Sequence, residues 1–185
     1  MFELLQLVGF TFLILRFFYW VGSALLLNEK KWKLVLLSQC IEGLLLLFIF
    51  SQIVGTIHIL PMQASLLQVY VGLFLVIVGV GSAFLAKRQL GDSWVYAAVY
   101  GVKPKQHLVT TGIYAIVRHP IYVSFAIGYI GIELLAGSWL WIAFLFLFIP
   151  AYMQGKKEEK ILLKHYGEKY KKYQQNTKML IPYLW

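Results

Sequence analysis

Residues 117–122, which read VRHPIY, combine side chains that can bind a charged ligand and move a proton. Arg118 and His119 stand directly before Pro120, and proline is favoured in the first turn of a helix. The stretch therefore predicts a cation and an imidazole at a helix N-terminus, where backbone N–H groups favour an anionic ligand. In the alternative interpretation, Arg118 only extends to lipid headgroups and His119 has no role.

The pair Glu158 and Glu159, within the stretch KKEEKIL, is the only place where acidic residues adjoin. An amphipathic helix at the membrane surface, with pairs such as Glu168 and Lys172, accounts for the pattern without any chemistry. Acids gain nothing from anionic headgroups, however, and lysine is the residue expected beside them. A binding or catalytic role for the pair therefore stays open.

Residues 107–114 read HLVTTGIY and end a long polar segment. The turn at Gly112 would let the backbone come close to a ligand, because glycine adopts conformations closed to other residues. The alternative is an ordinary loop.

Arg16, Glu42 and Glu133 are ionisable residues inside apolar runs, where such groups normally face the interior of a helix bundle and pair. We expect Arg16 and Glu42 to form a structural ion pair. The alternative is that these residues form the polar lining of a substrate cavity. Glu133 lies near the end of its run, and we place it at the membrane interface.

The composition excludes a soluble domain. Of the 185 residues, 60% are hydrophobic and only 14% are charged, with a mean hydropathy of +0.71; soluble domains average about 45–50% apolar and about 25% charged. A single cysteine, Cys40, excludes an internal disulfide and a cysteine-rich metal site, and we expect no metal. The net charge of +9 is interpreted as charge flanking a membrane, and we expect no nucleic-acid partner.

Five apolar runs define the expected architecture, at residues 4–27, 34–54, 66–86, 121–136 and 139–153. The last two are shorter than the roughly 20 residues of a full span and are separated only by Gly137 and Ser138, which predicts a tight helical hairpin. The sequence predicts an all-α integral membrane protein with about five transmembrane helices. We divide it into three N-terminal helices, residues 1–86, and a core, residues 87–185.

The connections between these runs alternate in charge. The segments at residues 28–33 and 87–118 and the tail from residue 154 are basic, whereas residues 55–65 and 137–138 carry no formal charge. The positive-inside rule then places the N-terminus outside and the C-terminus in the cytoplasm. We favour a bacterial inner membrane over an endoplasmic reticulum membrane, although both give this pattern.

Taken in order, these stretches resemble the isoprenylcysteine carboxyl methyltransferase family. The resemblance covers residues 90–182, about half the chain: LGDSW, then HLVTTGIYAIVRHPIY, a short apolar hairpin, and EEKILLKHYGEKYKKYQQNTKMLIP. Phospholipid N-methyltransferases share a related C-terminal pattern. Two positions depart from the family, with Ile113 where proline is frequent and Ser124 where glycine is common.

The resemblance implies a membrane enzyme that binds S-adenosylmethionine in a pocket on the cytosolic side, closed by C-terminal helices, and releases S-adenosylhomocysteine. By position in the motifs, the cofactor would contact His107, Leu108, Val109, Gly112, Tyr114, Arg118, His119, Pro120, Tyr122, Glu158 and Glu159. The catalytic residues would be Arg118, Glu158 and Glu159. The partners would be the lipid bilayer and a lipophilic acceptor, such as an isoprenylcysteine carboxylate or another small lipid.

Two other functions stay open. One is a membrane sterol or polyprenyl reductase using NADPH, although the basic residues are spread along the chain rather than clustered for a 2′-phosphate. The other is a scaffold without enzymatic activity, which leaves the adjacent glutamates unexplained. For the methyltransferase, the methylated atom of the acceptor also stays open, because a carboxylate needs no base whereas a phenol, thiol or amine must lose a proton.

Overall fold

The computed structural model describes all residues except 1, 26–31, 58, 64, 96–105 and 183–185. Over the described residues the chain forms helices and turns, with two isolated β-bridges, which confirms the all-α expectation. The helices are α1 (Phe2–Leu25), α2 (Trp32–Ile53), α3 (Leu66–Leu90), η1 (Gly91–Ser93), η2 (Gly112–Ala115), α4 (Pro120–Leu135), α5 (Trp141–Leu145), α6 (Phe148–Tyr166) and α7 (Glu168–Asn176).

Within the part of the chain that the structure describes, three helices are long and apolar enough to cross a bilayer, over Glu3–Ser23, Val35–Ile53 and Leu66–Ser93. They leave large apolar side chains exposed, such as Leu44 and Phe74, as expected of surfaces that face lipid. Helix α4 has 16 residues and is about 24 Å long, less than the roughly 30 Å of a bilayer core. The run at residues 139–153 is divided between α5 and the start of α6. Beyond three spans, the expected count of five stays a prediction.

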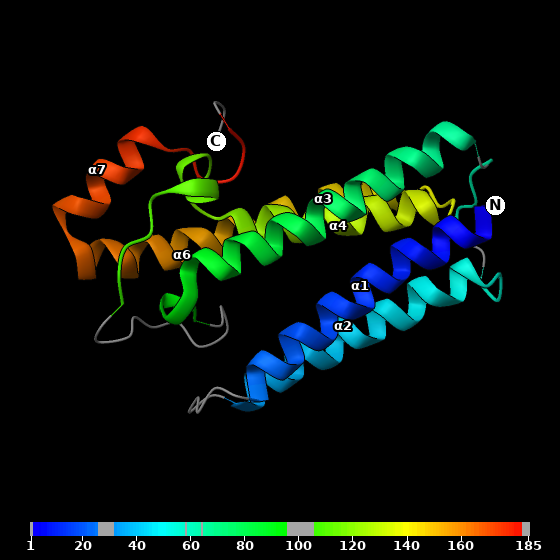
Figure 1. Cartoon of the computed structure of the whole chain (residues 1–185), viewed down its shortest axis with the longest axis horizontal. Coiled ribbons are helices and arrows are strands. Elements are labelled where there is room, and N and C mark those ends of the chain that lie inside the picture. Colours follow the sequence, from blue (N-terminus) through cyan, green and yellow to red (C-terminus); the bar gives the residue numbers. More distant parts are fainter. Residues whose placement is uncertain (1, 26–31, 58, 64, 96–105, 183–185) are drawn as a thin grey trace.

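Helices α3 and α4 lie side by side along most of their length and form the most extensive helix pair (Figure 1). Glycines let their backbones approach: a Cβ added at Gly79 would lie 2.6 Å from the backbone nitrogen of Gly128, and one at Gly131 would lie 2.7 Å from the carbonyl oxygen of Gly72. Small residues allow this close approach in membrane helices. The contact fixes the N-terminus of α4 beside the C-terminal half of α3.

The expected pair between Arg16 and Glu42 is confirmed. Arg16 Nη2 donates to Glu42 Oε1 and, at 3.1 Å, approaches the hydroxyl of Tyr129, while the guanidinium lies 4.4 Å from the ring centre of Phe125. The pair joins α1, α2 and α4 through charges that lipid cannot solvate singly.

Glu133 is not at an interface with solvent, because its side chain is fully buried. Gln52 Nε2 on α2 donates to its carboxylate at 3.2 Å. A carboxylate near the end of an apolar run can thus lie inside the bundle when a neighbouring helix supplies a donor.

The C-terminal elements gather at one end of the α3–α4 pair. Helix α6 runs back along α4, and α7 and the chain after it fold over the segment that precedes α4 (Figure 1). Backbone hydrogen bonds fasten the two segments, from Arg118 N to Lys178 O at 2.9 Å and from His119 N to Met179 O at 3.1 Å. The start of α2 and the end of α3 lie toward this same end, whereas the start of α1 lies at the other (Figure 1). The described parts of the basic segments therefore share one end; the side of the membrane that it faces stays a prediction.

Candidate active site

A cavity of about 340 Å³ opens at this end of the bundle. Its wall comes from α1, α2, the end of α3 and η1, the segment before α4, the first turns of α4, and α6. Pockets for small ligands span about 300–1,000 Å³ and combine apolar walls with a few polar groups. The cavity is of this kind, because tryptophan, phenylalanine and tyrosine rings surround a small set of carboxylates, amides and hydroxyls.

The cavity brings together side chains from two distant stretches that the sequence singles out. Six of the eleven residues expected at the cofactor line it: Tyr114, Arg118, His119, Pro120, Tyr122 and Glu158. The first five come from η2, the segment that follows it and the first turn of α4, and Glu158 comes from α6, so these two parts of the chain meet at the cavity.

The other expected residues lie outside the cavity wall: His107, Leu108, Val109, Gly112 and Glu159. The side chain of His107 is exposed, and its backbone nitrogen donates to Ser93 Oγ at 3.0 Å. Gly112 has a φ of +59° and lies against the side chain of Gln89, so its left-handed backbone serves a turn packed on α3.

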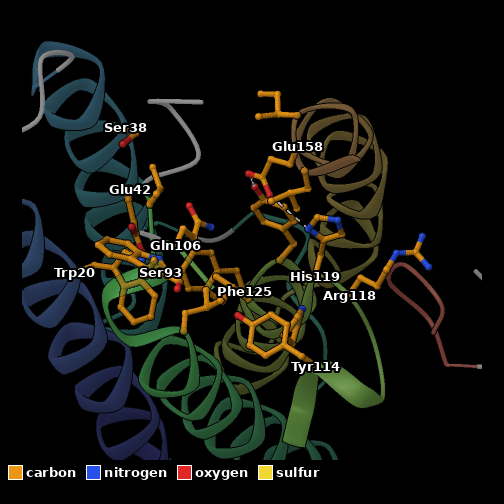
Figure 2. Close-up of a pocket in the computed structure, with 18 of the residues that line it drawn as sticks. Trp20, Ser38, Glu42, Ser93, Gln106, Tyr114, Arg118, His119, Phe125 and Glu158 are labelled. Carbon is orange, nitrogen blue, oxygen red and sulfur yellow. Dashed lines mark hydrogen bonds and ion pairs between the residues drawn. The ribbon is translucent and has the colours of Figure 1, made fainter. Parts of the chain in front are cut away.

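Glu158 forms the acidic side of the cavity together with His119 and Tyr122. The Tyr122 hydroxyl donates to Glu158 Oε1, and His119 Nδ1 lies 3.4 Å from Glu158 Oε2. The rings of His119 and Tyr122 are stacked, with centres 5.6 Å apart. Figure 2 shows Glu158 and His119 next to each other on this side of the cavity, joined by a dashed line. A carboxylate held in this way can accept hydrogen bonds from ligand hydroxyl or ammonium groups.

Glu159, the next residue on α6, is buried and turned away from the cavity. Arg118 Nε donates to its Oε1 at 2.6 Å, and Gln174 Nε2 donates to its Oε2 at 2.9 Å. His119 Nε2 lies 3.4 Å from Oε1. Burial alone would raise the pKa of Glu159, but His119 and Arg118 outweigh it and lower this pKa to about 2. Glu159 is therefore an ionised carboxylate inside the protein.

His119 lies between the two carboxylates. Burial acts to lower its pKa, but the hydrogen bonds and charges of Glu158 and Glu159 outweigh burial and raise the pKa above its ordinary value. Gly155 on α6 makes room for the imidazole, since a Cβ there would lie 3.2 Å from His119 Nε2. The arrangement favours a protonated His119 that lies between two carboxylates, Glu158 in the cavity wall and Glu159 behind it.

The guanidinium of Arg118 points away from the cavity, toward the C-terminal segment (Figure 2). Besides Glu159, it donates through Nη1 to the carbonyl oxygens of Thr177 and, at 3.3 Å, Gln174. The guanidinium thus holds the segment after α7 against the start of α4. Other atoms of Arg118, and not the guanidinium, line the cavity.

Several lining residues carry no sequence signal as site residues. They come from α1, α2, η1, the chain between η1 and η2, and α4, and include Trp20, Ser38, Gln39, Ser93, Trp94, Gln106 and Phe125. Glu42, expected in a structural pair or in a cavity lining, is in both. An acid within an apolar run was therefore the one available signal that α2 takes part in the site.

Three buried polar atoms of lining residues have no hydrogen-bond partner among the residues that the structure describes: the hydroxyl of Tyr114, Oε1 of Gln39 and Nε2 of His119. The His119 atom lies 3.4 Å from the Glu159 carboxylate. Buried polar groups nearly always have partners, so the Tyr114 and Gln39 atoms mark positions where a ligand can supply one. Within the same described part of the chain, no cluster of three or more potential metal ligands occurs.

Comparison with known proteins gives consistent results. A family model described as phospholipid methyltransferase matches residues 67–169. A protein of Schizosaccharomyces pombe named protein-S-isoprenylcysteine O-methyltransferase is 34% identical over 100 residues, which is 52% of this chain and 42% of that protein. Proteins of Oryza sativa subspecies indica and japonica named probable protein-S-isoprenylcysteine O-methyltransferase are each 27% identical over 117 residues, 62% of this chain and 61% of theirs. The matched part thus spans less than two thirds of each relative.

Proposed function

Because the chain belongs to the phospholipid methyltransferase family, whose model matches more than half of it, we propose a membrane-embedded methyltransferase that uses S-adenosylmethionine and a lipophilic acceptor. The observation that carries the proposal is the cavity where the stretches 107–122 and 158–162 meet, inside the family match and beside apolar helices. The names of the yeast and rice relatives support an acceptor with a long apolar chain.

The residues of the cavity fit S-adenosylmethionine, which carries a sulfonium, an ammonium, a carboxylate, ribose hydroxyls and an adenine. Glu158 suits an ammonium or a ribose hydroxyl, and the rings of Tyr122 and Phe125 suit a cation or a flat base. The unpartnered hydroxyl of Tyr114 offers a further hydrogen bond. When bound, this cofactor supplies a methyl group on a sulfonium sulfur, and the sulfur keeps the electron pair of the broken C–S bond.

The chain's own residues would contribute mainly by positioning, because an in-line transfer depends on holding two reactants in register. Glu158 would bind the cofactor directly, with His119 and Tyr122 fixing its carboxylate. Arg118 and Glu159 were expected to be catalytic, but their mutual contacts favour a positioning role, in which they fasten the C-terminal segment over the site. His107, Leu108, Val109 and Gly112 would support the turn that presents Tyr114.

The site would face the cytoplasm, because the described parts of the basic segments lie at its end of the bundle. The lipophilic acceptor would reach it from the bilayer. The division into an N-terminal part, residues 1–86, and a core, residues 87–185, stays part of this proposal.

A ligand-induced thermal shift of detergent-purified protein tests the proposal. We expect S-adenosylhomocysteine to raise the unfolding temperature and NADPH to leave it unchanged, since a ligand at 100 times its dissociation constant stabilises a fold by about 2.7 kcal/mol. Glu158→Gln should weaken this shift, whereas Glu168→Gln, at an exposed acid on α7, should not. Absence of a shift with S-adenosylhomocysteine in both detergent and lipid nanodiscs, or a shift with NADPH alone, would overturn the proposal.

A further inference from the structure

Helix α6 has two faces of opposite charge. The inward face carries both acids of the helix, and each is held by a residue outside α6: Glu158 by Tyr122 and Glu159 by Arg118. Because successive helical residues turn by about 100°, Lys160 lies on nearly the opposite side from Glu158. The exposed face formed there, called the lysine face below, consists of Lys156, Lys157, Lys160 and Lys164.

The lysine face continues an apolar surface of the same helix. Ile149 and Met153 are each more than half exposed, and steps of four, three and four residues lead from Ile149 to Met153, Lys156 and Lys160. Residues three and four apart lie on the same side of a helix. The exposed side therefore changes from apolar to cationic within one turn, after Met153. Figure 1 shows that α6 extends past the end of α3, so its last turns leave the helix bundle.

The charge of the lysine face is not compensated on its own surface. Among the residues that the structure describes, no carboxylate lies within ion-pair distance of its four ammonium groups. The Lys156 ammonium lies 5.3 Å from the ring centre of Tyr152, which precedes it by one turn. Leu163 adds an exposed apolar side chain between Lys160 and Lys164. An anionic partner with an apolar part would complement this surface.

The exposed surface of α7 is different. It also carries lysines, at Lys169, Lys171 and Lys172, and Lys171 pairs with Glu168 at 3.4 Å. None of the exposed side chains of α7 is apolar, since the buried residues of this helix are its tyrosines. A soluble polyanion could use either surface, whereas a headgroup attached to acyl chains needs lysines beside an apolar surface. Only α6 of these two helices offers both.

We propose that the lysine face binds the headgroups of anionic phospholipids at the membrane surface. Four or more basic residues on one side of an amphipathic helix are typical of such a contact. Lys156 and Lys160 are about 6 Å apart along the helix axis, and the headgroup layer of one leaflet is about 5–8 Å thick, so both ammonium groups reach it. The contact lies on the opposite face of α6 from the cavity, and the inference therefore does not depend on the proposed function.

Native mass spectrometry of the detergent-purified protein tests the proposal. The probes are phosphatidylglycerol and phosphatidylcholine with the same acyl chains. We expect the dissociation constant of phosphatidylglycerol to be at least fivefold lower, which corresponds to the value of about 1 kcal/mol for one lysine beside an anionic surface. Raising the ammonium acetate concentration from about 0.05 M to about 0.5 M should reduce this preference, because salt screens exposed charges.

Two sets of substitutions that remove equal charge locate the contact. The first set should abolish the preference: Lys156→Gln, Lys157→Gln, Lys160→Gln and Lys164→Gln. The second set removes exposed lysines on α7 and just after it and should keep the preference: Lys169→Gln, Lys171→Gln, Lys172→Gln and Lys178→Gln. Arginine at the four positions of the first set keeps the charge and should restore the preference. Near-ultraviolet circular dichroism checks that each variant is folded, and the comparison of lipids in the wild type needs no variant.

Three outcomes would overturn the inference. The first is an equal dissociation constant for the two lipids in the wild type, and the second is an equal loss of preference in the two sets of variants. The third is displacement of phosphatidylglycerol by glycerol 3-phosphate or by a poly-glutamate peptide at the same concentration, which would indicate a soluble anion or an acidic protein as the partner. Binding of S-adenosylhomocysteine enters none of these measurements, so a failure of the proposed function is distinguished from a failure of this inference.

Discussion

His119 lies between two carboxylates with different surroundings, Glu158 on the cavity and Glu159 beneath it. Its charge stabilises both, and the cost of burying an imidazolium is offset only while both carboxylates are ionised. The imidazole therefore couples the shape of the cavity to the packing of the C-terminal segment.

The pH dependence of stability follows from this coupling. Because the folded pKa of His119 is raised above its unfolded value, the stabilisation is complete below about pH 6.5 and is lost as pH rises through the folded pKa. We expect the unfolding temperature in detergent to fall on the alkaline side, and His119→Gln to remove this fall. His165→Gln, at an exposed histidine on α6, serves as the control and should keep it. An identical pH profile in His119→Gln and the wild type would contradict the assignment.

Glu159→Gln should lower the free energy of unfolding, because Glu159 pairs with Arg118 and does not line the cavity. It leaves Arg118 buried without its carboxylate, and breaking one partner of a buried pair costs about 3–5 kcal/mol. Because the pKa of Glu159 is about 2 against 4.5 for a free glutamate, this stabilisation is present above pH 4.5 and is lost as pH falls toward 2.

Thermal unfolding and trypsin cleavage at the exposed Lys178 measure this effect, because a loosened C-terminal segment is cut faster. Glu168→Gln is the control, since Glu168 only pairs with Lys171 on the surface at 3.4 Å. Equal unfolding temperatures and equal cleavage rates in the two variants would show that Glu159 does not fasten the segment.

At the scale of elements, the contact between α3 and α4 determines where the site forms. Gly79→Ala should lower the unfolding temperature, because its Cβ would lie 2.6 Å from Gly128 N and 2.7 Å from Ser124 O, and backbone atoms cannot move aside locally. Overpacking of this kind costs about 1–3 kcal/mol. Gly81→Ala, two residues on, meets nothing within 4 Å and is the matched control. Thermal unfolding in detergent compares the two, and an equal effect would show that the close approach does not matter.

The sequence predicts where the helices lie along the chain better than it predicts which face of each helix points into the protein. Apolar runs locate α1, α2 and α3, because the length of such a run is enough to indicate a span. These helices are apolar around their whole circumference, so periodicity does not tell which face points inward. The contribution of Trp20 and Gln39 to the cavity was for this reason not predictable, whereas Glu42 was visible as an isolated charge.

The same limit applies to Glu158 and Glu159. Their adjacency marks α6 as part of the site, but successive helical residues point about 100° apart. One carboxylate therefore faces the cavity and the other faces Arg118 and Gln174. The family resemblance assigns both to the cofactor, because the partner of Glu159 lies in a segment whose path only the tertiary structure gives.

At the scale of the whole molecule, the cavity exists because the α1–α2 pair closes onto the α3–α4 pair. Lys87, at the end of α3, fastens this closure. Its Nζ lies 4.1 Å from the ring centres of Tyr19 and Trp94 and 4.3 Å from that of Trp20, and it donates to Ser23 on α1. Cation–π contacts of a desolvated lysine are worth about 2 kcal/mol or more.

Trp20 and Trp94 also line the cavity, so the position of the Lys87 ammonium and the shape of the cavity are linked. Lys87→Met preserves the apolar stem and removes the charge. We expect lower stability, a changed tryptophan emission spectrum and a higher KM for the methyl acceptor, because α1 lines the cavity through Trp20. Arg88→Met, at the adjacent and exposed position, should leave all three unchanged. If Lys87→Met behaves like Arg88→Met, the contacts of Lys87 with the three rings are not what holds the two helix pairs together, and other contacts, such as those of Tyr129 with Arg16 and Glu42, carry that closure.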